Sequence, residues 1–174
     1  MSNEAVCILL DEGLTEDAEE LPDELTINTA VQLSFQRAMQ MLACATSDLP
    51  EVCLRFAVDV DVQQLNEQWR GKNAVTDVLS FPMQEHPPFN VQEPLGDIIL
   101  ALPFVIQEAR QRDLKPSAHI IHLIVHGVLH LCGFDHIDDP EAEQMQALEA
   151  DILLQLGLHH PYPDNTQEAD STHV

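Results

Sequence analysis

The chain has 174 residues, in which 30 Asp and Glu outnumber 7 Lys and Arg and give a formal charge of −23 with histidine neutral. A hydrophobic share of 45% supports a packed core, so wholesale disorder is excluded and a single domain over residues 1–160 is expected. On bulk charge alone, the acidity disfavours nucleic acids and anionic membranes as partners.

The sequence has no apolar run of transmembrane length, and an acid at Glu4 stands where a leader peptide would carry basic residues. A cytoplasmic protein without membrane contact is therefore expected. The four cysteines are scattered and form no C-x-x-C pair, which argues against a disulfide framework and against a thiolate zinc site.

Strand-like and helix-like patterns alternate along the chain. Short apolar or β-branched runs bounded by Pro, Gly or charged residues predict strands, and apolar residues at helical spacing predict helices. In chain order, the predicted elements are a strand at 5–10, a helix at 28–42, a strand at 51–60, a helix at 62–70, strands at 75–81 and 96–101, and helices at 103–112, 117–131 and 140–156. These elements predict an α/β (α+β) fold, with a mixed sheet of about four strands packed against about five helices.

The sequence also predicts features of two loop segments and of the helix at 62–70. The acidic stretch 11–24 is predicted to be a solvated loop, and Asp61 is predicted to cap the helix at 62–70. Leu65 and Trp69 are four residues apart and are expected on the apolar face of that helix. The polar, proline-containing segment 161–174 is predicted to be a flexible tail.

The helix predicted at 117–131 is almost wholly apolar, yet it carries four histidines, at positions 119, 122, 126 and 130. Burial of several imidazoles needs a compensating interaction. His126 and His130 project from one helix face at about 6 Å along the axis, so they can share one metal ion.

The third ligand has two candidates. His122 lies about 12 Å along the axis from His130, which is too far for one ion on an unbroken helix. His136 follows Gly133, a residue type that can turn the chain back toward the helix. We therefore predict a metal site formed by His126, His130 and His136, on the buried helix and the turn that follows it.

Three histidine ligands leave the fourth position of a tetrahedral Zn²⁺ site open, which is typical of catalytic zinc, and a water bound there would have a pKa near 7. One Zn²⁺ per chain is expected, with another divalent ion as the alternative. Peptidases with the H-E-x-x-H motif carry their general base directly after the first histidine. This chain has Gly127 at that position, which argues against a peptidase.

The segment HGVLHLCGFDH, from His126 to His136, resembles the H-G-x-L-H-L-x-G-Y-D-H motif of the YbeY endoribonucleases, also called rRNA maturation factors. Phe134 departs from the usual tyrosine of that motif. A second block agrees, because LNEQWR at 65–70 and TDVLSFP at 76–82 resemble the family's L-N-x-x-x-R and T-D-V-L-S-F-P elements. The resemblance extends over residues 50–162.

The resemblance implies a metal-dependent, single-strand-specific endoribonuclease that acts in late small-subunit rRNA maturation and in ribosome quality control. In that family the three histidines bind one metal ion, usually taken to be zinc, and the arginine of L-N-x-x-x-R is needed for cleavage. That arginine is Arg70 here. Asp135 is a candidate either for orienting a ligand imidazole or for stabilising the turn. Asp77 and Ser80 are candidate cleft residues, with the alternative that Asp77 only begins a strand. The attacking nucleophile, metal-bound water or a 2′-OH, is left open.

Two alternatives to this function remain at this point. One is another metallohydrolase, such as a peptidase or amidohydrolase, and the other is a non-catalytic ribosome-assembly factor. The expected partners are RNA, the ribosome, and basic ribosomal proteins or an assembly GTPase, with no DNA.

The charge distribution qualifies the expectation from bulk charge. All seven cations lie between residues 37 and 115, so a metal ion and a few central cations are expected to make a locally positive cleft with weak intrinsic RNA affinity. The acidic ends are interpreted either as surfaces for basic ribosomal proteins or as a salt-tolerance feature.

Overall fold

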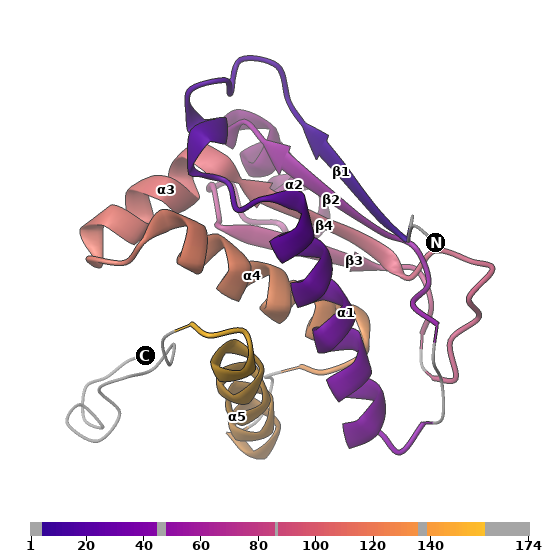
Figure 1. The fold of residues 1–174 in the computed structure, drawn as a ribbon. Helices are drawn as coiled ribbons and strands as arrows, with labels where there is room; N and C mark the ends of the chain where they lie inside the picture. Colours follow the sequence, from indigo (N-terminus) through magenta and orange to yellow (C-terminus); the bar gives the residue numbers. More distant parts are fainter. Residues whose placement is uncertain (1–4, 45–47, 86, 136–138, 159–174) are drawn as a thin grey trace.

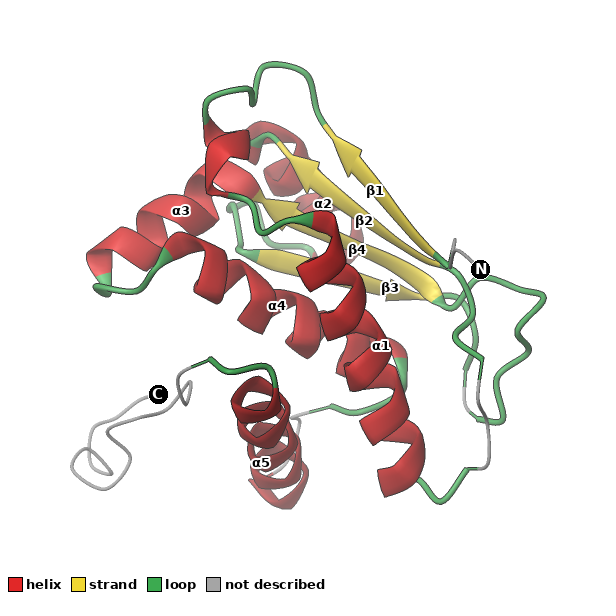
Figure 2. Cartoon of the chain, viewed as in Figure 1, coloured by secondary structure: helices red, strands yellow, loops and turns green. Residues whose placement is uncertain are grey.

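A mixed sheet of four strands, in the order β1-β2-β4-β3, organises the chain in this computed structural model, which describes residues 5–44, 48–85, 87–135 and 139–158 (Figures 1 and 2). The strands are β1 (Val6–Leu10), β2 (Val52–Ala57), β3 (Val78–Pro82) and β4 (Gly96–Ala101). β1, β2 and β4 run parallel, and β3 pairs antiparallel with β4 at one edge.

Five α-helices and one short 3-10 helix complete the described fold. They are η1 (Asp17–Glu20), α1 (Glu24–Met41), α2 (Asp59–Arg70), α3 (Leu102–Gln111), α4 (Pro116–Leu131) and α5 (Asp139–Gln155). The predicted α/β class with a four-stranded mixed sheet is confirmed. None of the helices in the described part of the chain is both long and apolar enough to cross a membrane.

The sheet separates two apolar clusters because side chains alternate along each strand. On β4, Ile98 and Leu100 enter the main core, which α1, α4 and α5 share. Ile99 and Ala101 face the opposite side and pack with Val62 of α2 in a smaller cluster. The sheet therefore has α4 on one face and α2 on the other.

Helix α4 occupies the centre of the main layer, where it contacts β3, β4, α1, α3 and α5 (Figure 1). Gly127 allows this close approach, since a Cβ at that position would lie 3.0 Å from two side-chain carbons of Ile98. Glycine therefore lets the histidine helix lie directly on β4, with its C-terminal end beside β3.

The acidic stretch 11–24 differs from the predicted solvated loop. Leu14 is only 3% exposed and belongs to the main core, and η1 lies within the stretch. Helix α1 begins at Glu24 rather than at residue 28, because the Asp23 side chain accepts a hydrogen bond from the Thr26 backbone N–H at 2.8 Å and caps the helix.

The start of α2 also differs from the prediction. The helix begins at Asp59, three residues before the predicted start, and Asp61 does not cap it. Asp61 instead accepts a hydrogen bond from Arg55 at 2.8 Å, and Arg55 also binds Asp11. An ion pair across elements has overridden the local capping preference of the aspartate.

The predictions for the strand at 75–81 and for Trp69 are wrong in part. Residues 75–77 precede β3 instead of forming its first part. Trp69 is not on a buried helix face, because it is 63% exposed. The predicted tail at 161–174 lies outside the described residues, so its flexibility and the domain end at residue 160 stay predictions.

Candidate metal centre

The structure brings His126 and His130 together at the C-terminal end of α4. Their Nε2 atoms are 3.0 Å apart, and the two rings meet edge to face with centroids 4.5 Å apart. Two nitrogens that bind one tetrahedral ion at about 2.0–2.1 Å would be about 3.4 Å apart, so this pair is close to the spacing that a shared ion requires. His136, the third predicted ligand, lies outside the described residues.

A buried carboxylate from α5 lies behind the histidine pair. Glu149 is 0% exposed, its Oε2 is hydrogen-bonded to His126 Nδ1, and its Oε1 lies 3.1 Å from His122 Nε2. Burial by itself would raise the pKa of Glu149, but the hydrogen bonds from His122 and His126 outweigh it and lower the pKa to about 2.

The ionised Glu149 determines which nitrogen of His126 carries the proton. A carboxylate only accepts hydrogen bonds, so His126 donates from Nδ1 and its Nε2 keeps a lone pair directed toward His130. A carboxylate behind a histidine is the arrangement that orients and strengthens histidine ligands in metal sites. Sequence reasoning did not assign this role to Glu149.

Near the N-terminal end of α4, His119 has a different partner. It is 3% exposed, and its Nε2 lies 2.8 Å from Glu108 Oε1 on α3. The hydrogen bond from His119 lowers the pKa of Glu108. Burial, together with the nearby Glu108 charge, raises the pKa of Asp77, which precedes β3. His119 is therefore a core residue that is held by a carboxylate.

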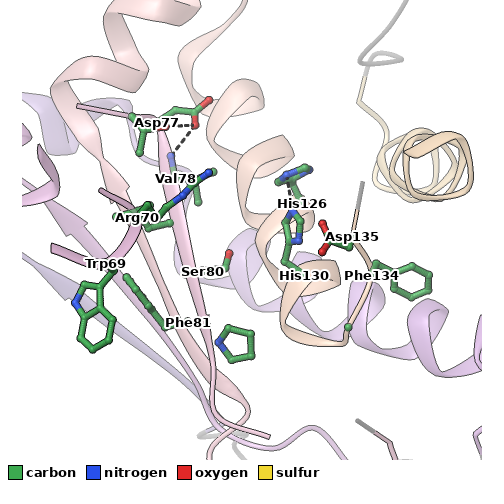
Figure 3. A pocket seen from close by; sticks show the side chains of 14 residues that line it. Trp69, Arg70, Asp77, Val78, Ser80, Phe81, His126, His130, Phe134 and Asp135 are labelled. Atoms are coloured by element: carbon green, nitrogen blue, oxygen red, sulfur yellow. Dashed lines mark hydrogen bonds between the residues drawn. The ribbon is translucent and has the colours of Figure 1, made fainter. Parts of the chain in front are cut away.

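His126 and His130 form one wall of a pocket of about 770 Å³ (Figure 3). The facing wall comes from the C-terminus of α2 and from β3, and the loop after α4 closes one side. The residues around the pocket are Trp69, Arg70, Thr76, Asp77, Val78, Leu79, Ser80, Phe81, Pro82, His126, His130, Gly133, Phe134 and Asp135. The structure thus brings the predicted cleft residues Asp77 and Ser80, and also Asp135, to the same pocket as the two histidines.

Arg70 is the last residue of α2 and lies across the pocket from the histidines (Figure 3). The helix ends there because Gly71 adopts a left-handed conformation with φ 73°. Asn66, 3% exposed, donates a hydrogen bond from its amide to the Ala74 carbonyl at 2.9 Å and so holds the turn against α2. Gly71, which ends the helix, and Asn66, one turn earlier, therefore fix the position of Arg70.

The sequence predicted that a few of the central cations make the cleft locally positive, but one arginine lines the pocket. Arg70 is the lone Lys or Arg among the pocket residues and makes no ion pair within the described part of the chain. Three other arginines are paired with acids at 2.6–2.9 Å, namely Arg37 with Asp151, Arg55 with Asp11 and Asp61, and Arg110 with Glu20.

Cys132 does not compete with the histidines for a metal. It is 1% exposed in the main core, and burial raises the pKa of its thiol to about 12. Within residues 5–44, 48–85, 87–135 and 139–158, no cluster of three or more His, Cys, Asp or Glu side chains is arranged to hold an ion. The described donor set is thus a pair of imidazoles backed by a carboxylate, which suits a borderline ion such as Zn²⁺.

The fold and this pocket define a small α/β protein in which an arginine faces two histidines, an arrangement suited to hydrolysis of an anionic substrate. The family model described as Endoribonuclease YbeY matches residues 15–157. The chain therefore belongs to the YbeY endoribonuclease family, and it is an enzyme of the nuclease class.

Three relatives named Endoribonuclease YbeY illustrate the match. A protein from Azorhizobium caulinodans is 43% identical over 136 residues, which are 76% of this chain and 86% of that protein. One from Alteromonas mediterranea is 46% identical over 64% of this chain and 70% of its own length. One from Rhizobium etli is 48% identical over 65% of this chain and 67% of its own length.

A solved structure supports the fold. The solution structure of a protein from Thermotoga maritima matches with a TM-score of 0.52 and 19% identity, and the match covers 95% of this chain and 96% of that one. At this identity the likeness concerns the fold alone.

Proposed function

We propose that this endoribonuclease is zinc-dependent and that it cleaves single-stranded rRNA in the cytoplasm during late small-subunit maturation and ribosome quality control. The observation that carries the proposal is the pair of His126 and His130 Nε2 atoms, 3.0 Å apart, on the pocket wall opposite Arg70. An ion on one wall and a guanidinium on the other would contact one phosphodiester from two sides.

The proposed zinc ligands are His126, His130 and His136. The bound ion would supply Lewis acidity toward a phosphoryl oxygen and would make a neighbouring hydroxyl group or water easier to deprotonate. Glu149 supports this ligand set, because its hydrogen bond to Nδ1 of His126 keeps the proton away from Nε2.

Arg70 would bind and orient the scissile phosphate. Its guanidinium can donate two parallel hydrogen bonds to phosphate oxygens and stabilises the negative charge that grows on them during cleavage. Its exposure at the end of α2 and its lack of an ion pair among the described residues leave the guanidinium ready for this contact. The nucleophile is a water or the substrate 2′-OH.

A zinc peptidase on the same histidines is disfavoured by packing. Its general base would be a glutamate at position 127, where even a Cβ would lie 3.0 Å from Ile98. A longer side chain would force α4 away from β4.

We also propose that the ribosome, through basic ribosomal proteins or an assembly GTPase, brings the enzyme to its RNA. With a charge of −23 and one arginine in the pocket, the chain has little of the positive surface that normally concentrates RNA. Acidic surface would instead contact basic proteins.

Elemental analysis and a cleavage assay test the proposal together. The wild type should contain about one zinc per chain, lose cleavage of single-stranded RNA on chelation and recover it with Zn²⁺. His130→Ala should lack both metal and cleavage, whereas Arg70→Lys should keep the metal and cleave poorly, since lysine cannot form the two-pronged contact. Equal metal content in wild type and His130→Ala would refute the site.

The same assay separates the two nucleophiles. An all-deoxy strand of the same sequence should be resistant if the 2′-OH attacks, and should be cleaved at a comparable rate if water attacks.

A further inference from the structure

Trp69 has an unusual place for its residue type. It is 63% exposed, although it lines the pocket next to Arg70 and is the one tryptophan of the chain. Leu65, one turn earlier on α2, packs on the smaller apolar cluster, whereas the indole lies outside it. A large aromatic side chain left in water at the edge of a polar pocket is typical of a binding surface.

Phe81 of β3 holds the indole in a defined orientation. The two ring centroids are 6.0 Å apart, and the ring planes meet at 67°, an edge-to-face contact. Such a contact fixes one ring against the other without stacking the two faces, and the high exposure of Trp69 shows that much of the indole surface meets solvent. The indole is thus a braced aromatic platform.

The platform lies beside the proposed phosphate-binding group. Trp69 and Arg70 are consecutive at the end of α2, and both line the pocket whose other wall carries His126 (Figure 3). In this view Arg70 lies between the indole and the two histidines. A nucleotide strand whose phosphate contacts Arg70 would therefore bring a neighbouring base to Trp69.

Because the molecule is strongly acidic, phosphate contacts alone would give it little affinity for an RNA strand. Most proteins that hold a single strand combine many phosphate contacts with aromatic stacking. Beside the proposed ion, this pocket offers one arginine for phosphate, so stacking, which needs no positive charge, is a further contribution that can hold the strand.

We propose that Trp69, braced by Phe81, is a stacking subsite for an unpaired nucleobase adjacent to the phosphate that Arg70 binds. This inference rests on the proposed cleavage of single-stranded RNA and specifies how the strand is held. Bases in a duplex are stacked on each other and cannot use the platform, so the subsite selects unpaired RNA with little preference among bases.

Because Trp69 is the one tryptophan, its fluorescence reports on the subsite directly in the metal-loaded wild type. The probe is a 2′-O-methyl oligoadenylate of about ten nucleotides, within the usual range of single-strand sites. The matched ligand is an abasic oligomer with the same number of phosphates. We expect the oligoadenylate to quench the tryptophan and the abasic oligomer to leave the fluorescence unchanged.

Variants provide the second readout, through the affinity for the same oligomers with a fluorescent label. Trp69→Ala should weaken oligoadenylate binding about 5- to 150-fold, the range of one stacked base, and should leave abasic binding unchanged. Trp69→Phe should restore most of the affinity. Val60→Ala is the matched control, because Val60 is a 54% exposed apolar residue of the same helix outside the pocket, and it should bind as the wild type does.

Two results would overturn the subsite: equal affinity of the wild type for both oligomers, or an unchanged affinity of Trp69→Ala for oligoadenylate. A cleavage assay on the same preparations distinguishes a wrong assignment of the stacking subsite from a wrong assignment of the RNA-cleaving function. Wild type that cleaves single-stranded RNA while Trp69→Ala binds it normally would refute only the subsite. Base-dependent quenching without any RNA cleavage would refute the function and keep the subsite.

Discussion

The two halves of α4 carry the same residue type in different chemical states. In the first half, His119 and His122 each present Nε2 to a carboxylate, from Glu108 and Glu149 respectively. In the second half, His126 uses Nδ1 for Glu149, so its Nε2 is directed at Nε2 of His130 beside the pocket. The nitrogen that contacts the carboxylate therefore distinguishes a histidine whose Nε2 is bound to a carboxylate from one whose Nε2 faces the other histidine beside the pocket.

The largest expected effect comes from removing Nε2 of His126 while keeping the donor at the Nδ1 position. The amide of asparagine reaches about as far as Nδ1, so His126→Asn can still donate to Glu149. We expect this variant to fold with wild-type thermal stability, yet to lose its zinc by elemental analysis and its RNA cleavage to the level of the chelated wild type.

His119→Gln is the matched control in the other half of the helix. The glutamine amide reaches the position of Nε2 and can donate to Glu108, so this variant should keep both metal and cleavage. If His126→Asn retained zinc, or if His119→Gln lost it, the proposed difference between the two halves would be wrong.

Glu149→Gln should have the next largest effect. A neutral amide cannot accept from both imidazoles. Where its NH₂ group faces His126, Nδ1 of His126 must accept, and the proton of that imidazole moves to Nε2. We expect zinc affinity to fall about 10- to 100-fold, the range seen when a carboxylate behind a ligand histidine is lost. Competition with a chromophoric chelator measures it. Glu143→Gln, an exposed position on α5, should leave zinc affinity unchanged, and a wild-type affinity for Glu149→Gln would contradict the role of the carboxylate.

Glu108→Gln should affect stability but not metal binding. The hydrogen bond from His119 lowers the pKa of Glu108 below its ordinary value of 4.5, so the carboxylate stabilises the fold fully above that pH, and the contribution disappears as the pH falls through the lower native value. We expect a loss of about 1–3 kcal/mol in the free energy of unfolding at pH 7, measured with urea.

The pH dependence provides the check on that assignment. The stability difference between wild type and Glu108→Gln should shrink as the pH is lowered from 5 through the native pKa of Glu108, whereas Glu67→Gln, at an exposed position of α2, should show no such trend. A difference that is constant with pH would mean that packing, and not the carboxylate, explains the loss.

These contacts also show which part of the molecule local sequence can predict. β4 has the predicted bounds, and α4 begins one residue before its predicted start, because each contains an uninterrupted local pattern next to a clear boundary residue, Gly96 for β4 and Pro116 for α4. The helix start at Glu24 was missed because it depends on one capping bond, which Asp23 accepts from the Thr26 backbone N–H.

In the candidate site, too, contacts within one helix are predictable from the sequence and contacts between helices are not. The spacing of His126 and His130 is a property of one helix, so the sequence alone predicted that they meet. Glu108 and Glu149 reach their histidines from other helices, 11 and 23 residues away in the chain, and no local periodicity specifies such contacts. The role of His136 as third ligand stays a prediction, because that residue lies outside the described part of the chain.

His122→Gln should have the smallest effect on the metal site, although His122 contacts the same carboxylate as His126. The glutamine amide can replace Nε2 as donor to Oε1 of Glu149, so the other oxygen still accepts from His126. We expect zinc affinity to change by less than about tenfold, below the effect of losing the carboxylate itself, and RNA cleavage at saturating zinc to be unchanged. A loss of zinc as large as that of His126→Asn would show that His122 acts with the second half of α4, and the boundary between the two halves would then lie before His122 and not after it.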